Sequence, residues 1–329
     1  MQRKIRLGVC VAAALALLAV LVARTSGMPE IATHPPGSFA FAALGDAPYD
    51  VLEDLRYPFL LRDIAAHDLD FVVHVGDLFW GTCSDARYRR SLAWLDSLPQ
   101  PVIYTPGDNE WCDCWQRVSG RFAPRERLAR LREIYFAEPE RSLGGKPLAL
   151  ASQGGEFVEN ARWSHEGVVF ATVHIPGSSN GYERFPDRTA ADDDEVRRRT
   201  AAAAAWVRAT FEEARGSRAA AVVLFFQANP SFEAPPDDPE RLCFEPFLTA
   251  LEEEVERFSG PVLAVHGDQH VYLVDQPLVR RATGARLTNF TRLQVPGSPR
   301  VGWVHVVVTP GAEPPFAFQQ RVVPRWKYW

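Results

Sequence analysis

Short apolar runs alternate with longer amphipathic stretches along much of the chain. The apolar runs are typical of buried strands, and the stretches between them have the spacing of helices. We expect strands at Phe39–Leu44, Phe71–Val75 and Pro101–Thr105, and helices at Leu52–His67, Ser84–Leu98 and Arg125–Phe136. Strands that alternate with helices in this way predict a parallel βαβαβ core.

The second half of the chain continues with strands and one long helix. Residues 156–160 and 168–173 predict a hairpin, and acidic residues at the start of Asp192–Arg215 favour a helix there. Further strands are expected at Ala220–Phe226, Val262–Val265 and Val271–Val274, and near 288–293 and 301–308. We therefore expect one α/β domain over residues 38–329, after a Pro- and Gly-containing linker at 25–37.

The N-terminus has the pattern of an export signal. Basic residues at positions 3, 4 and 6 precede an unbroken apolar run from Leu7 to Ala23, which matches a secretory signal peptide. The run is slightly shorter than the roughly 20 residues of a membrane span, but it could serve as an uncleaved anchor. We expect residues 1–24 to be a signal peptide or an N-terminal membrane anchor. The protein is then exported to the periplasm or to the outer face of the membrane, where residues 7–23 could anchor it.

If the protein is exported, its cysteines can form disulfides, because disulfides form in oxidising compartments. Beyond Cys10 the chain has Cys83, Cys112, Cys114 and Cys243. Three pairings of these four are open, and a bridge that joins Cys83 to the Cys112–Cys114 segment is plausible, since each follows a motif loop. The alternative is four buried free thiols. The net charge of -5 gives no sign of the basic patch of a nucleic-acid-binding protein, so we expect no nucleic-acid partner.

The dipeptide Gly-Asp occurs four times, and each time it closes an apolar run. The aspartates are Asp46, Asp77, Asp108 and Asp268, and His270 follows the last of them by two residues. Sites in open α/β sheets form outside the carboxyl ends of the strands. If the four strands are neighbours in the sheet, the four carboxylates meet at one edge. Such a cluster repels itself, and one or two cations are the natural compensation.

The motifs resemble those of the calcineurin-like metallophosphoesterases. The segments that carry the resemblance are Asp46-Ala47-Pro48, Gly76-Asp77, Gly107-Asp108-Asn109-Glu110, Gln227 and Gly267-Asp268-Gln269-His270. Their order, spacing and strand context match the family over roughly residues 38 to 275. The resemblance implies a four-layer α/β/β/α sandwich with two divalent metal ions at one edge of the sheets. It also implies hydrolysis of a phosphoester by a metal-activated water.

Carried over residue by residue, the resemblance implies an oxygen-rich metal site. Its ligands would be Asp46, Asp77, Asp108, Gln227, Asp268 and His270, with Asp77 between the two metals. Several of these stand where relatives have histidine or asparagine, and Pro48 replaces a histidine ligand outright. Carboxylate and amide oxygens favour hard cations, so we expect Mn²⁺ or Mg²⁺ rather than zinc or iron.

Two residues are candidates for the catalytic role. Asn109 replaces the histidine that in relatives helps the leaving group depart; its amide can donate a hydrogen bond but cannot transfer a proton. His174 opens a polar, Gly-containing loop that could face the site, and its imidazole could replace the lost one. The alternative for His174 is an ordinary histidine between strand and loop.

We expect a phosphoester or a phosphorylated small molecule as substrate, and membrane association through the N-terminal segment. The alternative function is a degenerate family member that binds metal or a phosphorylated ligand without turnover. The replacements at Pro48, Asn109 and Gln227 support that alternative.

Overall fold

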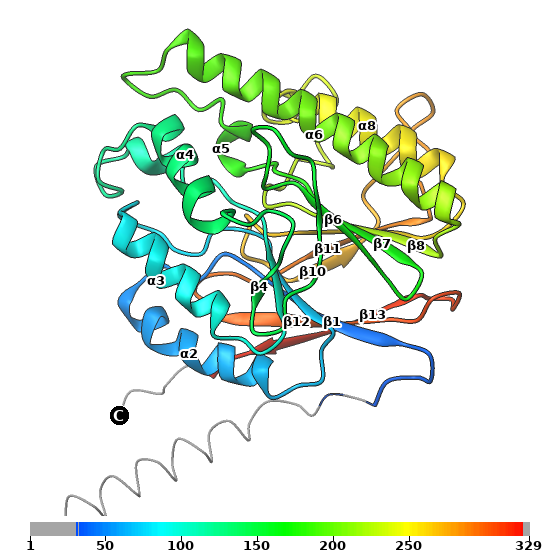
Figure 1. Cartoon of the computed structure of the whole chain (residues 1–329). Coiled ribbons are helices and arrows are strands. Elements are labelled where there is room, and N and C mark those ends of the chain that lie inside the picture. Colours follow the sequence, from blue (N-terminus) through cyan, green and yellow to red (C-terminus); the bar gives the residue numbers. More distant parts are fainter. Residues whose placement is uncertain (1–30, 32, 325–329) are drawn as a thin grey trace, which may run out of the picture.

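The computed structural model describes residues 31 and 33–324. Two sheets pack face to face, and helices cover the outer face of each (Figure 1). The first sheet has the order β13-β12-β1-β2-β3-β4 and the second the order β10-β11-β9-β8-β7-β6-β5. The predicted four-layer α/β/β/α sandwich is confirmed.

The first sheet has a parallel centre, formed by β1, β2 and β3, and antiparallel edges. Its strands are β1 (Phe39–Leu44), β2 (Phe71–His74), β3 (Pro101–Tyr104), β4 (Leu143–Gly144), β12 (Gly302–Val308) and β13 (Phe316–Val322). The helices on its outer side are α2 (Val51–Ala65), α3 (Asp85–Asp96) and α4 (Pro124–Tyr135). This confirms the predicted parallel βαβαβ core.

The centre of the second sheet is parallel and consists of β7, β8, β9 and β11. The strands at its two edges are antiparallel to their neighbours. Its strands are β5 (Ala151–Ser152), β6 (Ala161–His165), β7 (Val168–Thr172), β8 (Ala221–Phe225), β9 (Val262–His266), β10 (Leu273–Asp275) and β11 (Phe290–Gln294). Its outer face is covered by α6 (Ala190–Ser217) and α8 (Glu245–Arg257). Shorter elements in the loops are a 3₁₀ turn, η1 (Cys112–Trp115), and the single turns α5 (Gly177–Asn180) and α7 (Pro239–Leu242).

Three apolar clusters separate the four layers. Successive residues of β1 show the arrangement, because Ala40 and Ala42 belong to the cluster under α2, α3 and α4, whereas Phe39 and Phe41 belong to the cluster between the sheets. The third cluster joins the second sheet to α6 and α8. Both faces of β1 are therefore buried, which is why its sequence is apolar throughout rather than alternating.

Parts of the prediction were wrong. The expected strand at 156–160 forms turns, and the partner of β7 is β6, Ala161–His165. The two strands are joined at Glu166 and Gly167, which both have positive φ (45° and 76°), as a two-residue hairpin turn requires. Strand β10 begins at Leu273 rather than at Val271. Helix α8 and strand β13 were not predicted.

The expected N-terminal segment, residues 1–24, lies outside the described residues. Residues 25–30 and 32 of the expected linker also lie outside them. Among the helices that the structure does describe, none is both long and apolar enough to cross a bilayer.

Candidate active site

The four Gly-Asp turns meet at the carboxyl ends of strands from both sheets. Asp46, Asp77 and Asp108 follow the neighbouring strands β1, β2 and β3. Asp268 follows β9 in the other sheet, so the condition that the four strands are neighbours in one sheet is not met. The turns nevertheless come into contact, because the backbone N–H of Asp268 donates to Asp46 Oδ1 at 3.0 Å.

Glycines allow this close approach. A Cβ on Gly107 would lie 2.0 Å from Asp77 Oδ1, and a Cβ on Gly267 would lie 2.2 Å from Asp46 Oδ2. A Cβ on Gly177 would lie 2.5 Å from Asp108 Oδ2 and 3.1 Å from Asp268 Oδ1. No larger residue fits at these positions without displacing a carboxylate. The glycines therefore let backbone from three loops approach the acidic groups.

The backbone at the site is strained. Asp46, Asp77, Asp268 and His270 all have positive φ, between 54° and 78°. Non-glycine residues in this region cost about 1–3 kcal/mol each and persist where the surrounding structure over-determines them, often at functional sites. The strained residues are three aspartates of the Gly-Asp turns and the histidine two residues beyond the last of them.

Asp77 is held by two neighbouring side chains. Tyr49 Oη donates to Asp77 Oδ2 at 2.5 Å, and Asn109 Nδ2 donates to the same oxygen at 3.0 Å. The backbone N–H of Asn109 donates to Asp77 Oδ1 at 3.3 Å. The ring of Tyr49 also meets His270 edge to face, with 5.0 Å between the centroids. Asn109 thus lies beside Asp77, while its catalytic role stays a prediction, and Tyr49 is a residue of this group that the sequence analysis missed.

Glu110 ties two of the turns together. Its carboxylate accepts hydrogen bonds from the backbone N–H groups of Asp77, Leu78 and Gly107. Burial raises its pKa to about 7, against the lowering effect of these bonds. Its backbone oxygen accepts from Tyr88 Oη. Glu110 therefore fixes the distance between the Gly-Asp turn that follows β2 and the one that follows β3.

The loop at 176–181 covers one side of the site, as its polar, Gly-containing sequence suggested. Ser178 Oγ lies 2.9 Å from Asp108 Oδ2 and 2.7 Å from Asp113 Oδ1. Ser178, Ser179 and Asn180 form a turn with φ of 47°, 56° and 56°, which is left-handed. A left-handed turn of three L-residues is costly, so it needs support from the rest of the protein.

Arg199 of α6 supplies that support. It is fully buried and donates to Asn180 Oδ1 at 2.7 Å and to Asn180 O at 2.8 Å. Its charge is balanced by Glu195, with Nε 3.0 Å from Oε1, and its guanidinium lies over the Trp111 ring at 5.2 Å. A side chain from the outer helical layer thereby holds the loop against Asp108.

His270 is oriented for binding through Nε2. Its Nδ1 lies 2.8 Å from the backbone oxygen of Ser298, which can only accept, so Nδ1 carries the proton and Nε2 keeps its lone pair. Burial lowers the pKa of His270, which keeps the ring neutral. Ser298 Oγ in turn donates to Glu53 Oε1 at 2.8 Å, and Glu53 Oε2 accepts from the Tyr49 N–H at 2.7 Å. An ordered neutral imidazole is the form that binds metals.

Gln227 is hydrogen-bonded to two of the loops at the site. Its Oε1 accepts a hydrogen bond from the Gly177 N–H at 2.5 Å, and its backbone oxygen accepts from the Gly267 N–H at 3.0 Å. It therefore joins the 176–181 loop to the β9 turn. Its role as a metal ligand stays a prediction.

The structure places His174 in a different position from that expected of a catalytic imidazole. It is fully buried, with Nδ1 2.7 Å from Glu159 Oε1, and Trp111 Nε1 donates to its Nε2 at 3.2 Å. Burial raises the pKa of Glu159, but hydrogen bonds from His174 and Arg132 outweigh this effect and lower it to about 2. Both ring nitrogens of His174 are thus engaged inside the protein, and the ring positions Trp111.

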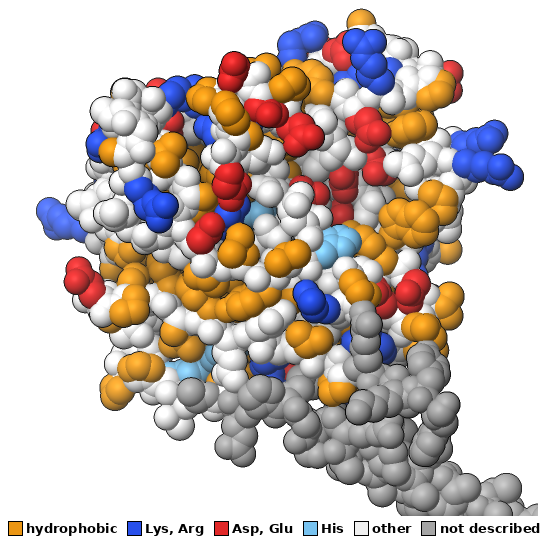
Figure 2. All heavy atoms as spheres, turned by 180° about the vertical axis from the view of Figure 1, so that it is seen from behind, with side chains coloured by type: hydrophobic (Ala, Val, Ile, Leu, Met, Phe, Trp, Pro, Cys, Tyr) orange, Lys and Arg blue, Asp and Glu red, His pale blue; other side chains and the backbone are white. Residues whose placement is uncertain are grey.

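The carboxylates of the site are buried beside one another, and the hydrogen bonds that they accept do not offset the cost of their charges. Burial raises the pKa of Asp46 and of Asp77 well above the ordinary range, and the charges of neighbouring carboxylates raise it further. Burial and the charge of Asp108 raise the pKa of Asp268 to about 6. Acidic side chains also gather at the surface, in the upper half of the face shown in Figure 2. A bound cation would relieve this repulsion.

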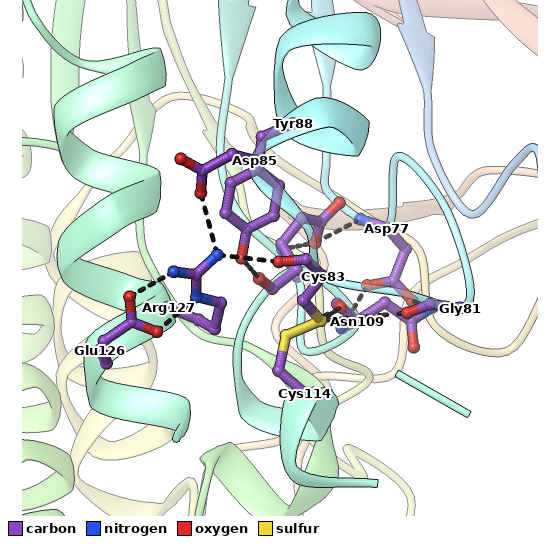
Figure 3. The surroundings of a disulfide bond; sticks show 11 residues. Asp77, Gly81, Cys83, Asp85, Tyr88, Asn109, Cys114, Glu126 and Arg127 are labelled. Atoms are coloured by element: carbon purple, nitrogen blue, oxygen red, sulfur yellow. Dashed lines mark hydrogen bonds and ion pairs between the residues drawn. A yellow bond between two sulfur atoms is a disulfide. The ribbon is translucent and has the colours of Figure 1, made fainter. Parts of the chain in front are cut away.

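A disulfide ties the β2 and β3 turns together beside Asn109. Cys83 is bonded to Cys114, one of the bridges expected between the two loops, whereas Cys112 and Cys243 are free. The two sulfurs lie 3.5 and 3.8 Å from the Asn109 backbone oxygen (Figure 3). Arg127 Nη1 donates to the Cys83 backbone oxygen at 3.0 Å. The bridge therefore fixes the backbone of the candidate catalytic asparagine.

The residues present fit a cation by their chemistry and charge. Within the described residues, Asp46 Oδ2 is buried and has no hydrogen-bond partner, and oxygen donors suit Mg²⁺ and Mn²⁺. In residues 31 and 33–324, however, no three histidine, cysteine, aspartate or glutamate side chains are close enough to form a preformed metal-binding group. Asp77 is instead hydrogen-bonded to Tyr49 and Asn109. A cation therefore requires these side chains to adjust.

The family model of the calcineurin-like phosphoesterases matches residues 41–272 of this chain. The chain belongs to the calcineurin-like phosphoesterase family. This family comprises phosphoesterases that typically bind divalent metals, and all the Gly-Asp turns fall within the matched residues. The solved structure of PhoD is similar, with a TM-score of 0.53 and 13% identity over 86% of this chain. The alignment spans 66% of that chain, and at this identity it supports the fold alone. A comparison with curated proteins finds no match.

Proposed function

We propose that this family member hydrolyses a phosphoester with the help of divalent metal ions, Mn²⁺ or Mg²⁺ rather than zinc or iron. The observation that carries the proposal is the meeting of four carboxylates on glycine-supported turns, with Asp46 Oδ2 buried and, among the described residues, without a partner. Asp46, Asp77, Asp108, Asp268 and His270 would hold the metal. The metal would supply an activated water and charge stabilisation at the phosphorus.

The chain's own residues then bind and orient the substrate. The Asn109 side-chain amide, 9% exposed at the site, donates a hydrogen bond to a phosphoryl oxygen and stabilises the growing charge. Since it cannot transfer a proton, substrates with good leaving groups should react fastest. The disulfide and Glu110 keep this amide and Asp77 at a fixed distance from each other.

Binding without turnover is the second candidate function. It is favoured by the hydrogen bonds of Asp77, whose Oδ2 accepts from both Tyr49 and Asn109. If these bonds persist in solution, Asp77 does not act as the central metal ligand. The site would then recognise a cation or a phosphorylated ligand through its remaining groups.

An assay with aryl phosphate monoesters and diesters separates the two functions. The full chain is tested with Mn²⁺, beside Asp77→Asn and a matched control, Asp187→Asn, which changes an exposed aspartate. Turnover in the parent and the control that is lost in Asp77→Asn supports the hydrolase. Metal or phosphate binding without turnover in any of the three supports the second candidate.

We also propose that the protein acts outside the cytoplasm, in the cell envelope. The sequence of residues 1–24 supports this location, and so does the Cys83–Cys114 disulfide, because disulfides persist in oxidising compartments. Fractionation of cells that express the full chain tests it: recovery of the protein in the cytosolic fraction, with both cysteines reduced, would contradict this location.

A further inference from the structure

Helix α2 has apolar side chains on both of its faces. Its inward face, which includes Tyr57, Leu60 and Ile64, is buried in the cluster against the first sheet. On its outward face, Val51, Leu52 and Leu55 are 75%, 51% and 53% exposed. A surface helix of a soluble domain normally carries polar residues on its outer face. The outer face of α2 is therefore suited to an apolar partner.

This apolar face borders the candidate active site. Val51 follows Tyr49, whose hydroxyl reaches Asp77, by two residues. Two more exposed apolar side chains lie next to site residues: Val271, 52% exposed, follows His270, and Trp80, 48% exposed, follows Asp77 by three residues. Tyr49 contacts both Asp77 and His270, so each of these apolar positions lies within three residues of a member of this contact group.

The C-terminal end of the described chain is hydrogen-bonded to α2, and the N-terminal end packs on the apolar cluster that α2 shares with α3 and α4. Ile31 packs on the cluster that contains the inward face of α2. At the other end, Arg56 of α2 donates to the Val323 backbone oxygen at 2.5 Å. The apolar run 7–23 precedes the first point, and the sequence Arg-Trp-Lys-Tyr-Trp of residues 325–329 follows the second. Tryptophan and tyrosine beside basic residues are typical of membrane–water interfaces.

We propose that the outer face of α2 is a membrane-docking surface, which seats the protein on a lipid bilayer with the site residue Tyr49 near the lipid surface. Exposed apolar side chains on one helix face are those that an interfacial helix inserts between headgroups. The C-terminal end favours a bilayer over a protein partner, because it leads from α2 into a sequence suited to a membrane–water interface, and the apolar run 7–23 precedes the described domain. This proposal does not depend on catalysis.

Hydroxyl-radical footprinting of the full chain tests the proposal, because it reads side-chain exposure directly. The probe is a vesicle of phosphatidylethanolamine and phosphatidylglycerol. The control position is Leu242, which is 52% exposed, like Leu52, but precedes α8 in the opposite outer layer (Figure 1). Vesicles should reduce the oxidation of Leu52 and Leu55 about threefold as the apolar face enters the headgroup region. The oxidation of Leu242 should not change.

A variant provides the second measurement. Val51→Gln, Leu52→Gln and Leu55→Gln together should leave the melting temperature unchanged, because the positions are exposed. Val271 should lose reactivity on vesicles in the parent and keep it in the variant. Unchanged oxidation of α2 on vesicles would overturn the proposal. Two results without vesicles would also overturn it. If Leu52 and Leu55 are oxidised far less than Leu242, the chain itself covers the face. If their oxidation falls as the protein concentration rises, a second copy covers it.

Discussion

Replacing Asp268 by asparagine removes a negative charge from the site and keeps the shape of the side chain. The asparagine oxygen can still accept the hydrogen bond that Asp268 Oδ2 receives from the Asn229 N–H at 2.8 Å. Burial and the charge of Asp108 raise the pKa of Asp268 from an ordinary 3.8 to about 6. The charged form is therefore destabilised in the folded protein, and the variant lacks this cost.

The sign and size of the effect follow from the shift. Because the folded pKa lies above the unfolded one, the cost is absent below about pH 4 and complete above about pH 7. A shift of about two units corresponds to about 3 kcal/mol, and partial solvent exposure reduces this to about 2 kcal/mol. Asp268→Asn should thus be more stable than the parent by about this amount at pH 8, and equally stable near pH 4.

Urea unfolding of protein stripped with a chelator measures both values, with Asp187→Asn as the exposed control. Mn²⁺ should reverse the order at pH 8, since a ligand at 100 times its dissociation constant stabilises by about 2.7 kcal/mol and the variant loses a ligand. A metal-free variant less stable than the parent at pH 8 would refute the idea of uncompensated charge. Equal stabilisation of both proteins by Mn²⁺ would refute the placement of Asp268 beside a cation.

Substitutions at three further supports of the site, the disulfide, Arg199 and Glu110, test their roles. Serine at Cys83 or Cys114 should lower the free energy of unfolding by about 2–4 kcal/mol in non-reducing urea titrations. Serine at the free Cys243 should leave it unchanged. Equal effects at the three positions would contradict a stabilising role of the disulfide. Arg199→Leu leaves the buried Glu195 and the 176–181 loop without their partner, so it should lower the free energy of unfolding by about 3–5 kcal/mol. Thermal unfolding measures this loss. A loss below about 1 kcal/mol would contradict the support of the loop by Arg199. Glu110→Gln leaves one of three backbone amides unpaired, so it should cost about 1–3 kcal/mol. Urea unfolding near pH 5 measures this loss, because the raised pKa of Glu110 leaves little cost of its charge at that pH. An unchanged midpoint would show that these amides find other partners.

The sequence predicted the parts of the site that carry a local signal. Each Gly-Asp follows an apolar run, and this pattern alone placed Asp46, Asp77, Asp108 and Asp268 at strand ends. The parallel core of the first sheet was predicted for the same reason, since its strands and helices alternate over short distances. The condition that all four strands are neighbours in one sheet is not met, and nothing local shows that β9 belongs to the other sheet.

The remaining contacts depend on packing between distant segments. Ser178 reaches Asp108 across 70 positions of sequence, and Tyr49 reaches Asp77 across 28. One signal for Tyr49 was its place directly after the first motif segment, which ends at Pro48. The shape of the loop around Ser178 depends on Arg199, whose helix was predicted but whose contacts were not. Strand β6 was misplaced because Arg162 and His165 interrupt its apolar pattern.

Metal analysis tests the central claim most directly. The full chain is purified without chelator, its metals are measured, and Mn²⁺ binding to the stripped protein is followed by calorimetry, in the parent and in Asp46→Asn. The account predicts Mn²⁺ or Mg²⁺ bound in the parent and weakened binding in the variant, with Asp187→Asn unchanged. Stoichiometric zinc or iron would contradict the proposed hard-metal site, and no binding at any Mn²⁺ or Mg²⁺ concentration would contradict a metal site of any kind at these carboxylates.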